Sequence, residues 1–193
     1  MSILGQRIHV IGNSCSGKST LAAELGDILN IPVVELDALN WQPNWVGLND
    51  TNPELFKQKI CEATAGEAWI LAGSYERFTR PIAWVCLDTI IWLDLPLPLL
   101  FKRVLKRSWQ RWYSQELLWG TNRENFWRQL KVWNKNDSLI WWISTQYWRK
   151  RRSMLKNMLD PELKHIRFIR LTSEQEVAAF KQQLQHSLNP VTT

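Results

Sequence analysis

The 193-residue sequence contains no apolar run close to the roughly 18 residues that cross a bilayer. Its first residues also lack the apolar stretch and cleavage site of a secretory signal peptide. Its three cysteines are widely separated and have none of the short spacings that hold zinc, so neither a disulfide framework nor a metal knot is indicated. These absences predict a cytoplasmic protein with no membrane segment.

Acidic residues are scarce in one segment, residues 101–152. Thirteen lysines and arginines stand there against three acids, although the whole chain carries a net charge of only +6. Such a concentration of cations predicts an anionic partner. The phosphates of a small nucleotide and those of a nucleic acid both fit this charge.

The overall composition excludes disorder and fibrous architectures, because hydrophobic residues make up 45% of the chain and charged residues 22%. A chain of 193 residues suits one domain with a buried core. We therefore expect residues 1–193 to form a single domain.

Short apolar runs alternate along the chain with helical stretches. The runs predicted to be strands span residues 7–12, 31–36, 69–73, 88–95 and 165–171. Helices are predicted over residues 18–29, from Pro53, from Leu99, and after a capping box at residues 173–176. Strands that alternate with helices predict a parallel sheet covered on both faces, so the fold class is α/β.

The motif that carries chemistry lies between the first strand and the first helix. Gly12, Gly17, Lys18 and Ser19 match the pattern G-x-x-x-x-G-K-[ST] in the strand–loop–helix context that it requires. Glycines let the backbone approach a polyphosphate, and the loop N–H groups and the helix dipole then hold it. We therefore predict that ATP or GTP is bound by Gly12, Asn13, Ser14, Cys15, Ser16, Gly17, Lys18, Ser19 and Thr20.

Three side chains of the loop have individual roles in this prediction. Lys18 bridges the β and γ phosphates and takes part in catalysis, and the Ser19 hydroxyl coordinates Mg²⁺. Thr20 contacts the α phosphate. Cys15 is assigned no catalytic role, although a thiol beside a lysine can be reactive.

Three further stretches extend the pattern, namely residues 36–41 (LDALNW), 69–75 (WILAGSY) and 92–96 (WLDLP). With the loop, they make nearly the whole chain resemble the adenylate-kinase-like P-loop proteins often named DNA topology modulation proteins, which are related to the nucleoside monophosphate kinases. The resemblance implies a three-layer P-loop NTPase fold with five parallel strands in the order 2-3-1-4-5. It also implies an acceptor site beside strands two and three, and a helical, arginine-bearing lid at about residues 101–152.

The resemblance also implies site residues on the acceptor side. Asp37 matches the family aspartate that orients an acceptor hydroxyl or a Mg²⁺-bound water, although an aspartate after a strand can equally be a turn or a helix cap. Gly73 and Arg77 match the glycine turn and the basic residue that contact the acceptor. The alternative for Arg77 is an ordinary surface arginine.

In the lid, the resemblance makes Arg103, Arg107 and Arg123 candidates to clamp the phosphates during transfer. One position departs from the family pattern, because Ala72 stands where related proteins carry an aspartate that helps to hold Mg²⁺. Either Asp37 or a water network replaces that carboxylate, or the protein binds nucleotide and transfers phosphate poorly.

Two functions fit these observations. The first is an ATP-binding, Mg²⁺-dependent phosphotransferase for a small acceptor such as a nucleotide or nucleoside. The second is a nucleotide-regulated nucleic-acid-binding protein with weak or no kinase activity, because eight of the thirteen tryptophans lie at positions 109–148 among cations, and rings among cations can stack bases. The sequence identifies neither the acceptor nor the oligomeric state.

The tryptophans of this region also have a purely structural interpretation, which we favour. Trp127, Trp133, Trp141 and Trp148 then lie on the core sides of amphipathic helices, with the cations on the solvated faces. The basic run at residues 149–152 is in that case the end of a helix, where cations suit the dipole.

Overall fold

The structure is a computed structural model that describes residues 4–114, 117–118, 122–123 and 139–188. A parallel sheet of five strands lies at its centre, in the order β2-β5-β1-β6-β9. The strands are β1 (Arg7–Gly12), β2 (Val33–Glu35), β5 (Trp69–Ala72), β6 (Thr89–Leu93) and β9 (Arg167–Leu171). Counted along the chain, this is the predicted order 2-3-1-4-5, so the α/β fold class is confirmed.

Two short antiparallel ladders lie outside this sheet and account for the other strand labels. They pair β3 (Trp41–Gln42) with β4 (Val46–Gly47), and β7 (Leu117–Leu118) with β8 (Asn122–Arg123).

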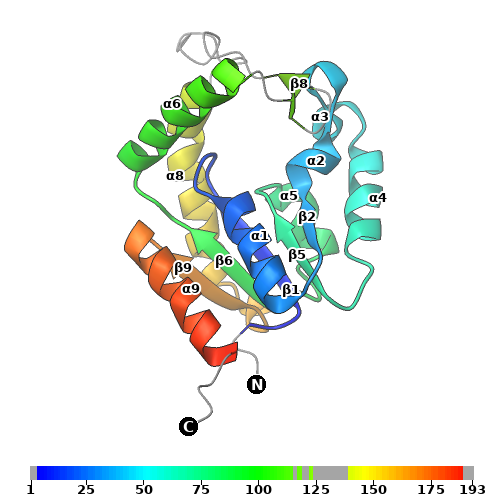
Figure 1. Cartoon of the computed structure of the whole chain (residues 1–193). Helices are drawn as coiled ribbons and strands as arrows, with labels where there is room; N and C mark the ends of the chain where they lie inside the picture. Colours follow the sequence, from blue (N-terminus) through cyan, green and yellow to red (C-terminus); the bar gives the residue numbers. More distant parts are fainter. Residues whose placement is uncertain (1–3, 115–116, 119–121, 124–138, 189–193) are drawn as a thin grey trace.

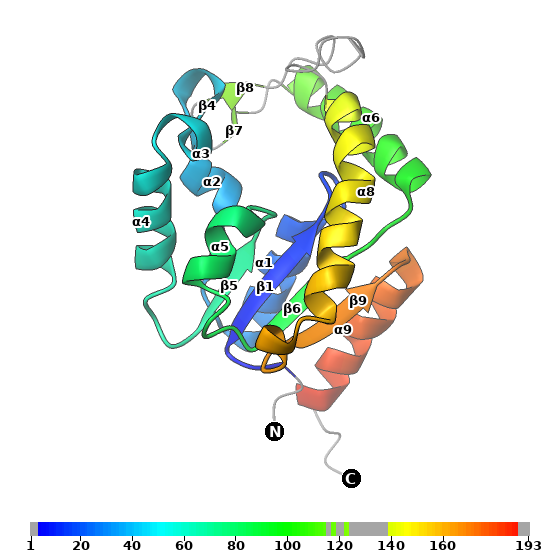
Figure 2. The same ribbon diagram turned by 180° about the vertical axis from the view of Figure 1, so that it is seen from behind.

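Helices cover both faces of the sheet (Figures 1 and 2). α1 and α9 lie on one face and α5 and α8 on the other, with α4 beside α5 and α6 along α8. The longer helices are α1 (Lys18–Leu29), α4 (Pro53–Ala63), α5 (Glu76–Ile82), α6 (Leu97–Ser114), α8 (Leu139–Met158) and α9 (Glu174–Leu188). The shorter ones are α2 (Leu36–Asn40), α3 (Leu48–Thr51), η1 (Pro43–Trp45) and η2 (Pro161–Leu163). Among the described helices, none combines the length and apolar character needed to cross a membrane.

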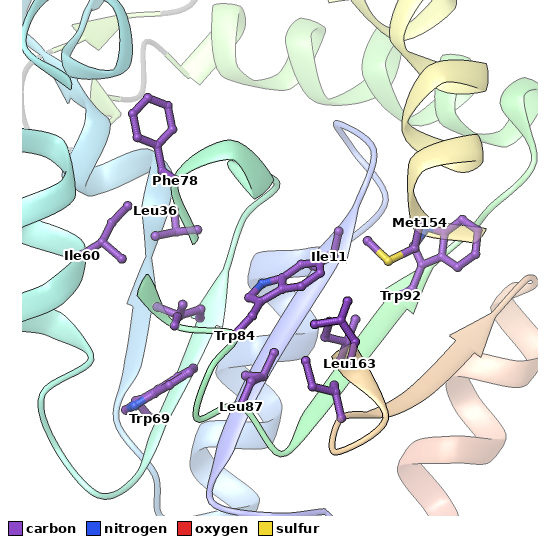
Figure 3. Close-up of a cluster of buried hydrophobic side chains, with 14 of the residues drawn as sticks. Ile11, Leu36, Ile60, Trp69, Phe78, Trp84, Leu87, Trp92, Met154 and Leu163 are labelled. Atoms are coloured by element: carbon purple, nitrogen blue, oxygen red, sulfur yellow. The ribbon is translucent and has the colours of Figure 1, made fainter. Parts of the chain in front are cut away.

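Each face of the sheet has its own apolar cluster, because successive strand side chains point to opposite faces. On the α1 side, Ile8 and Val10 of β1 pack with Leu25 of α1. On the other side a larger cluster includes Trp69 and Met154, and Figure 3 shows it against the sheet. Full burial of each such side chain contributes about 1.5–3 kcal/mol relative to exposure. These clusters therefore hold the helices in place on the sheet.

Two predicted helix starts are confirmed by their caps. Asn52 Oδ1 accepts a hydrogen bond from the backbone N of Leu55 at 3.1 Å, immediately before Pro53. Ser173 Oγ accepts from the backbone N of Glu176 at 3.1 Å, and α9 follows. Both caps depend on neighbours in the sequence, which is why the pattern alone predicted them.

Several predicted boundaries were wrong by a few residues, among them those of the strands predicted at 88–95 and 165–171, which span Thr89–Leu93 and Arg167–Leu171. The second strand covers only Val33–Glu35, because Leu36 turns into the buried cluster and begins α2. The helix after β6 begins at Leu97 instead of Leu99. Pro98 does not separate strand from helix, because a proline in the first turn of a helix loses no hydrogen bond.

The region after α6 differs from the predicted helical stretch. The β7–β8 ladder interrupts it. α8 continues to Met158, so the basic run at residues 149–152 lies inside a helix and not at its end.

The favoured interpretation of the tryptophans is wrong for Trp148, which is 55% exposed. The buried stripe of α8 runs through Ile143, Tyr147 and Met154 and leaves Trp148 to one side. Trp141 is half-buried. Trp127 and Trp133 lie outside the part of the chain that the structure describes.

His9 is a fully buried titratable residue in the central strand. Trp84 Nε1 donates to His9 Nδ1 at 3.1 Å, so the ring carries its proton on Nε2, which donates to the backbone O of Gly73 at 3.1 Å. Burial lowers the pKa of His9 from 6.5 to about 3. The neutral ring thus supports the carbonyl of the glycine at which β5 ends.

We expect His9 to make the fold sensitive to acid. Between pH 6.5 and about 3, the unfolded chain binds a proton on this residue that the folded chain does not bind. The free energy of unfolding therefore decreases as the pH falls, by up to about 1.4 kcal/mol per pH unit for this one proton. Urea unfolding between pH 7 and pH 4 measures the slope, and His9→Gln should reduce it by about one proton.

A control for this effect is His186, which is exposed on α9. The variant His186→Gln should keep the wild-type slope. If the slopes of wild type and His9→Gln are equal, His9 is not the residue that links folding to pH.

Candidate functional site

The phosphate loop joins β1 to α1 and turns tightly. A Cβ atom at Gly12 would lie 2.6 Å from Ser16 Oγ and 2.9 Å from the backbone O of Leu93, so no larger residue fits there. Gly17 has a φ of 97° and Cys15 a φ of 61°, both in the left-handed region. Left-handed residues among ordinary ones are the geometry in which successive N–H groups converge on an anion.

The N-terminus of α1 is open to an anion. In the described chain, no side chain caps this helix at Gly17 and its first turn contains no acid. Ser16 Oγ is buried and has no hydrogen-bond partner among the described atoms. Ser19 and Thr20 are exposed in the first turn. The N–H groups of the first turn and the positive end of the helix dipole can therefore attract an anion.

Lys18 is the cation of this site. Its Nζ folds back and donates to the backbone O of Asn13 at 3.0 Å. Burial lowers the pKa of Lys18; Asp37 is the charge that most opposes this change, and Arg107 adds to it. Because Lys18 is half-buried, its ammonium is screened less by water and can attract a phosphate more strongly than an exposed lysine would.

Asp37 lies in the first turn of α2, just beyond the carboxyl end of β2. Tyr75 Oη donates a hydrogen bond to Asp37 Oδ1 at 2.6 Å. Burial raises the pKa of Tyr75, and the carboxylate of Asp37 raises it further, so the phenol keeps its proton and remains a donor. The tyrosine thus orients the carboxylate whose charge acts on Lys18.

Gly73 and Ser74 connect the end of β5 to this site. Gly73 has a φ of 153°, and a Cβ atom there would lie 2.7 Å from Leu36 Cβ, so a side chain at this position would displace the start of α2. Ser74 Oγ donates to the backbone O of Gly12 at 2.6 Å and accepts from its N at 3.3 Å. The turn after β5 is therefore tied directly to the phosphate loop.

The predicted lid arginines have different surroundings. Arg103 Nη1 donates to the backbone O of Ser16 at 2.9 Å, and its Nη2 pairs with Glu174 Oε1 at 2.6 Å, so it supports the loop from α6. One turn later, Arg107 acts on the pKa of Lys18, and its Nε is buried without a partner among the described residues. The side chain of Arg123 lies outside what the structure describes.

A cleft of about 460 Å³, partly open to solvent, lies between the loop and α8. Asn13 and Ser74 line one wall, and Lys150 and Arg151 line the other. Figure 2 shows α8 passing beside the turn that follows β1. The cleft therefore places two cations of α8 next to the phosphate loop.

Comparison with solved structures identifies the fold. The chain is similar to a gluconokinase from Sinorhizobium meliloti 1021, with a TM-score of 0.51 and 17% identity over 99% of this chain and 95% of that one. It is also similar to shikimate kinase from Acinetobacter baumannii in complex with shikimate, with a TM-score of 0.52 and 16% identity over 100% and 97%. The fold is that of a P-loop kinase.

A third structure of the same fold is deoxyadenosine kinase from M. mycoides with bound dCTP, with a TM-score of 0.50 and 14% identity over 96% of this chain and 100% of that one. No protein-family model matches the sequence, and no curated protein does.

Two of the predicted positions contribute differently to this P-loop kinase fold. Arg77 is exposed, and its guanidinium lies 5.8 Å from the centroid of the Phe78 ring. Ala72 is 3% exposed and packs with Ile70 in the cluster on the α1 side. The end of β5 therefore provides no carboxylate to the site.

Sequence reasoning missed three residues of the site, namely Ser74, Tyr75 and Lys150. A usable signal existed for the first two, since they follow Gly73 at the carboxyl edge of the sheet, where the ends of β1 and β2 also lie. For Lys150 the signal is the helical spacing from Ile143 and Tyr147, which places it near the buried stripe of α8. It had been counted only as one cation of the basic run.

Proposed function

We propose that the protein is a Mg²⁺-dependent phosphotransferase that transfers the γ phosphate of ATP, or of GTP, to a hydroxyl group of a small acceptor. One observation carries the proposal. The oriented carboxylate of Asp37 acts on Lys18, the lysine of a phosphate loop whose helix N-terminus is uncapped in the described chain. A base and a phosphate-binding cation are thus held at one edge of the sheet, as group transfer requires.

In this proposal the acceptor oxygen attacks the γ phosphorus, and the bond from that phosphorus to the bridging oxygen breaks. ADP leaves with the bonding electron pair, and the proton of the acceptor hydroxyl passes to Asp37. Lys18 and Arg107 stabilise the negative charge on the transferring phosphoryl oxygens. Arg103 supports the backbone of the phosphate loop through its hydrogen bond to the carbonyl oxygen of Ser16. Arg123 and Arg77 stay predicted contacts to the phosphates and to the acceptor.

Mg²⁺ fits the residues present only in part. The Ser19 hydroxyl is exposed at the start of α1 and can coordinate it, whereas no group of three metal-ligating acids, histidines or cysteines occurs among the described residues. Mg²⁺ commonly takes one protein ligand together with phosphate oxygens and waters. When bound, it would neutralise phosphate charge. Because position 72 is alanine, Asp37 would then act at the phosphates without a carboxylate from that position.

We further propose that the chain belongs to the adenylate-kinase-like P-loop proteins named DNA topology modulation proteins, and that residues 101–152 contain their lid. The motifs at residues 36–41, 69–75 and 92–96 support this assignment. These motifs contain Asp37, Ser74 and Asp94, which lie at the carboxyl edge of the sheet.

The test is ADP release in a coupled assay, with Mg²⁺-ATP and a panel of nucleosides, nucleotides and polyhydroxy acids. We expect at least one acceptor to raise the rate well above the acceptor-free rate, because Asp37 needs a hydroxyl group to activate. The site does not act as proposed if ADP release is independent of every acceptor and is unchanged in Lys18→Ala.

A second candidate function, nucleotide-regulated nucleic-acid binding, is favoured by the outer face of α6. Lys102, Lys106, Trp109 and Tyr113 share one helical face and are all exposed. Cations and rings in this arrangement suit single-stranded nucleic acid. Affinity for DNA or RNA should then fall steeply with salt, by about 10³-fold between 50 and 200 mM if six phosphates are contacted. Flat salt dependence would remove this candidate.

A further inference from the structure

The short β7–β8 ladder has one buried face. Leu118 and Asn122 stand directly opposite each other in this antiparallel pair, so their side chains point to the same side. Leu118 is 5% exposed and Asn122 is 2% exposed, whereas Leu117, which points the other way, is 51% exposed. Two strands cannot bury a face by themselves. Another part of the protein therefore covers the side with Leu118 and Asn122.

The β3–β4 hairpin (residues 41–47) lies against this face, and Figures 1 and 2 show β8 beside this part of the molecule. Asn122 Oδ1 accepts a hydrogen bond from the backbone N of Trp45 at 2.8 Å. Its Nδ2 donates to the backbone O of Gln42 at 3.0 Å. One amide side chain thus satisfies both a donor and an acceptor of the hairpin backbone, which are costly to leave unpaired when buried.

The turn that Asn122 holds has an unfavourable backbone conformation. Asn44 has a φ of 61° and Trp45 a φ of 60°, both in the left-handed region. Asparagine tolerates this region, but tryptophan does not favour it, because its Cβ atom crowds the backbone. Such a residue persists only where contacts around it maintain the conformation. The hydrogen bonds from Asn122 are contacts of this kind, so docking of the ladder stabilises the shape of the turn.

The hairpin is fixed at both ends to α2, the helical turn that contains Asp37. β3 begins directly after Asn40, and the backbone N of Trp41 donates to the backbone O of Asp37. Beyond the hairpin, the backbone N of Asn49 donates to Oδ1 of the fully buried Asn40 at 2.8 Å. A displacement of the hairpin therefore acts on the turn that holds Asp37.

We propose that Asn122 is a positioning residue for Asp37. By docking the β7–β8 ladder on the hairpin, it keeps α2 in the place where Asp37 accepts the hydrogen bond of Tyr75 Oη. The catalytic consequence rests on the proposed function, in which Asp37 is the base, whereas the docking contact does not. Asn122 acts through the hairpin backbone and needs no contact with either substrate.

Three tryptophan amides report on separate steps of this arrangement. The N–H of Trp45 is bonded to Asn122, that of Trp41 to the backbone O of Asp37, and that of Trp69 to the backbone O of Gln6 at the central sheet. The experiment is hydrogen exchange of the full-length protein labelled with ¹⁵N-tryptophan and observed by NMR. Trp69 serves as the internal reference for global stability, because it lies in the core of the sheet.

In Asn122→Ala, exchange relative to Trp69 should accelerate by about tenfold at Trp45 and by about threefold or more at Trp41. Leu118→Ala leaves the amide of Asn122 in place and removes the other buried side chain of the face, so it should accelerate the same two amides. The matched control is Leu117→Ala on the exposed side of the ladder, which should change neither.

If Asn122→Ala leaves exchange at Trp45 unchanged, the docking contact is overturned. Acceleration at Trp45 without acceleration at Trp41 would show that the contact is local and does not position α2. With an active acceptor, Asn122→Ala should also lower kcat by about tenfold and leave nucleotide affinity within a few-fold of wild type. An unchanged kcat would overturn the positioning role. If wild type transfers no phosphate, the proposed function fails, and the exchange rates still decide whether Asn122 holds α2 in place.

Discussion

Replacement of Lys18 by alanine should lower kcat/KM for ATP by about 10²–10³-fold, because it removes a cation that contacts the transferring phosphate in the proposed complex. The lysine lies at the phosphate loop, where its Nζ donates to the backbone O of Asn13. It is half-buried and interacts electrostatically with Asp37, so its charge is screened less than that of a surface lysine. Its loss cannot be replaced by Arg107, which reaches the site from a different helix.

The same variant separates binding from folding. Removal of this ammonium relieves its desolvation but also removes its hydrogen bond to the backbone O of Asn13, so Lys18→Ala should unfold close to the wild-type temperature. Mg²⁺-ATP should stabilise wild type by about 2.7 kcal/mol at a hundred times Kd and should stabilise the variant far less. Thermal unfolding with and without Mg²⁺-ATP measures both effects. Equal stabilisation of the two proteins by ATP would contradict the role of Lys18.

Replacement of Asp37 by asparagine should lower kcat by about 10²–10⁴-fold and leave nucleotide affinity within a few-fold of wild type. Asparagine can still accept the hydrogen bond from Tyr75, so the local structure is kept. It cannot take the proton of an acceptor hydroxyl, and this is the function that the proposal assigns to Asp37. Steady-state rates with the best acceptor of the panel provide kcat, and a fluorescent ATP analogue provides the affinity.

Tyr75→Phe is the comparison that separates chemistry from structure. It keeps the carboxylate and removes only the hydrogen bond that orients it. We expect a loss of kcat of about tenfold, much smaller than that of Asp37→Asn. If Asp37 were only a helix-turn residue held by Tyr75, the tyrosine variant would be the more damaging of the two and Asp37→Asn would retain its kcat.

The first strand, the phosphate loop and the first helix could be predicted to the residue. Arg7–Gly12 is a strand and Lys18–Leu29 a helix because β-branched residues, the two glycines and the helical periodicity all act over short distances in the chain. The order of the five strands could also be predicted, through the family resemblance. Local patterns were less informative at the edges of the sheet, where burial of Leu36 shortened β2 and placed Asp37 on a helical turn.

The basic segment shows the limit of such reasoning. Its cations form one run in the sequence, yet Arg149 and Arg152 are exposed, Arg151 pairs with Asp94, and Lys150 lines the cleft. Helical periodicity predicts which of these positions lie near the core. Their partners, however, are Asp94, which follows β6, and Glu76 of α5. Because these partners are far from α8 in the sequence, helical periodicity does not reveal the contacts that orient the helix.

By itself, the sequence determined that this protein has a phosphate loop between a strand and a helix in an α/β fold, because glycine conformation, strand propensity and helix periodicity are local properties. Only the tertiary structure decided that Asp37 acts on Lys18 and accepts from Tyr75, that Ser74 holds Gly12, and that Lys150 enters the cleft. These contacts depend on how the carboxyl ends of β1, β2 and β5 are placed relative to α8. Packing of distant elements determines that meeting point, and packing is a property of the whole chain.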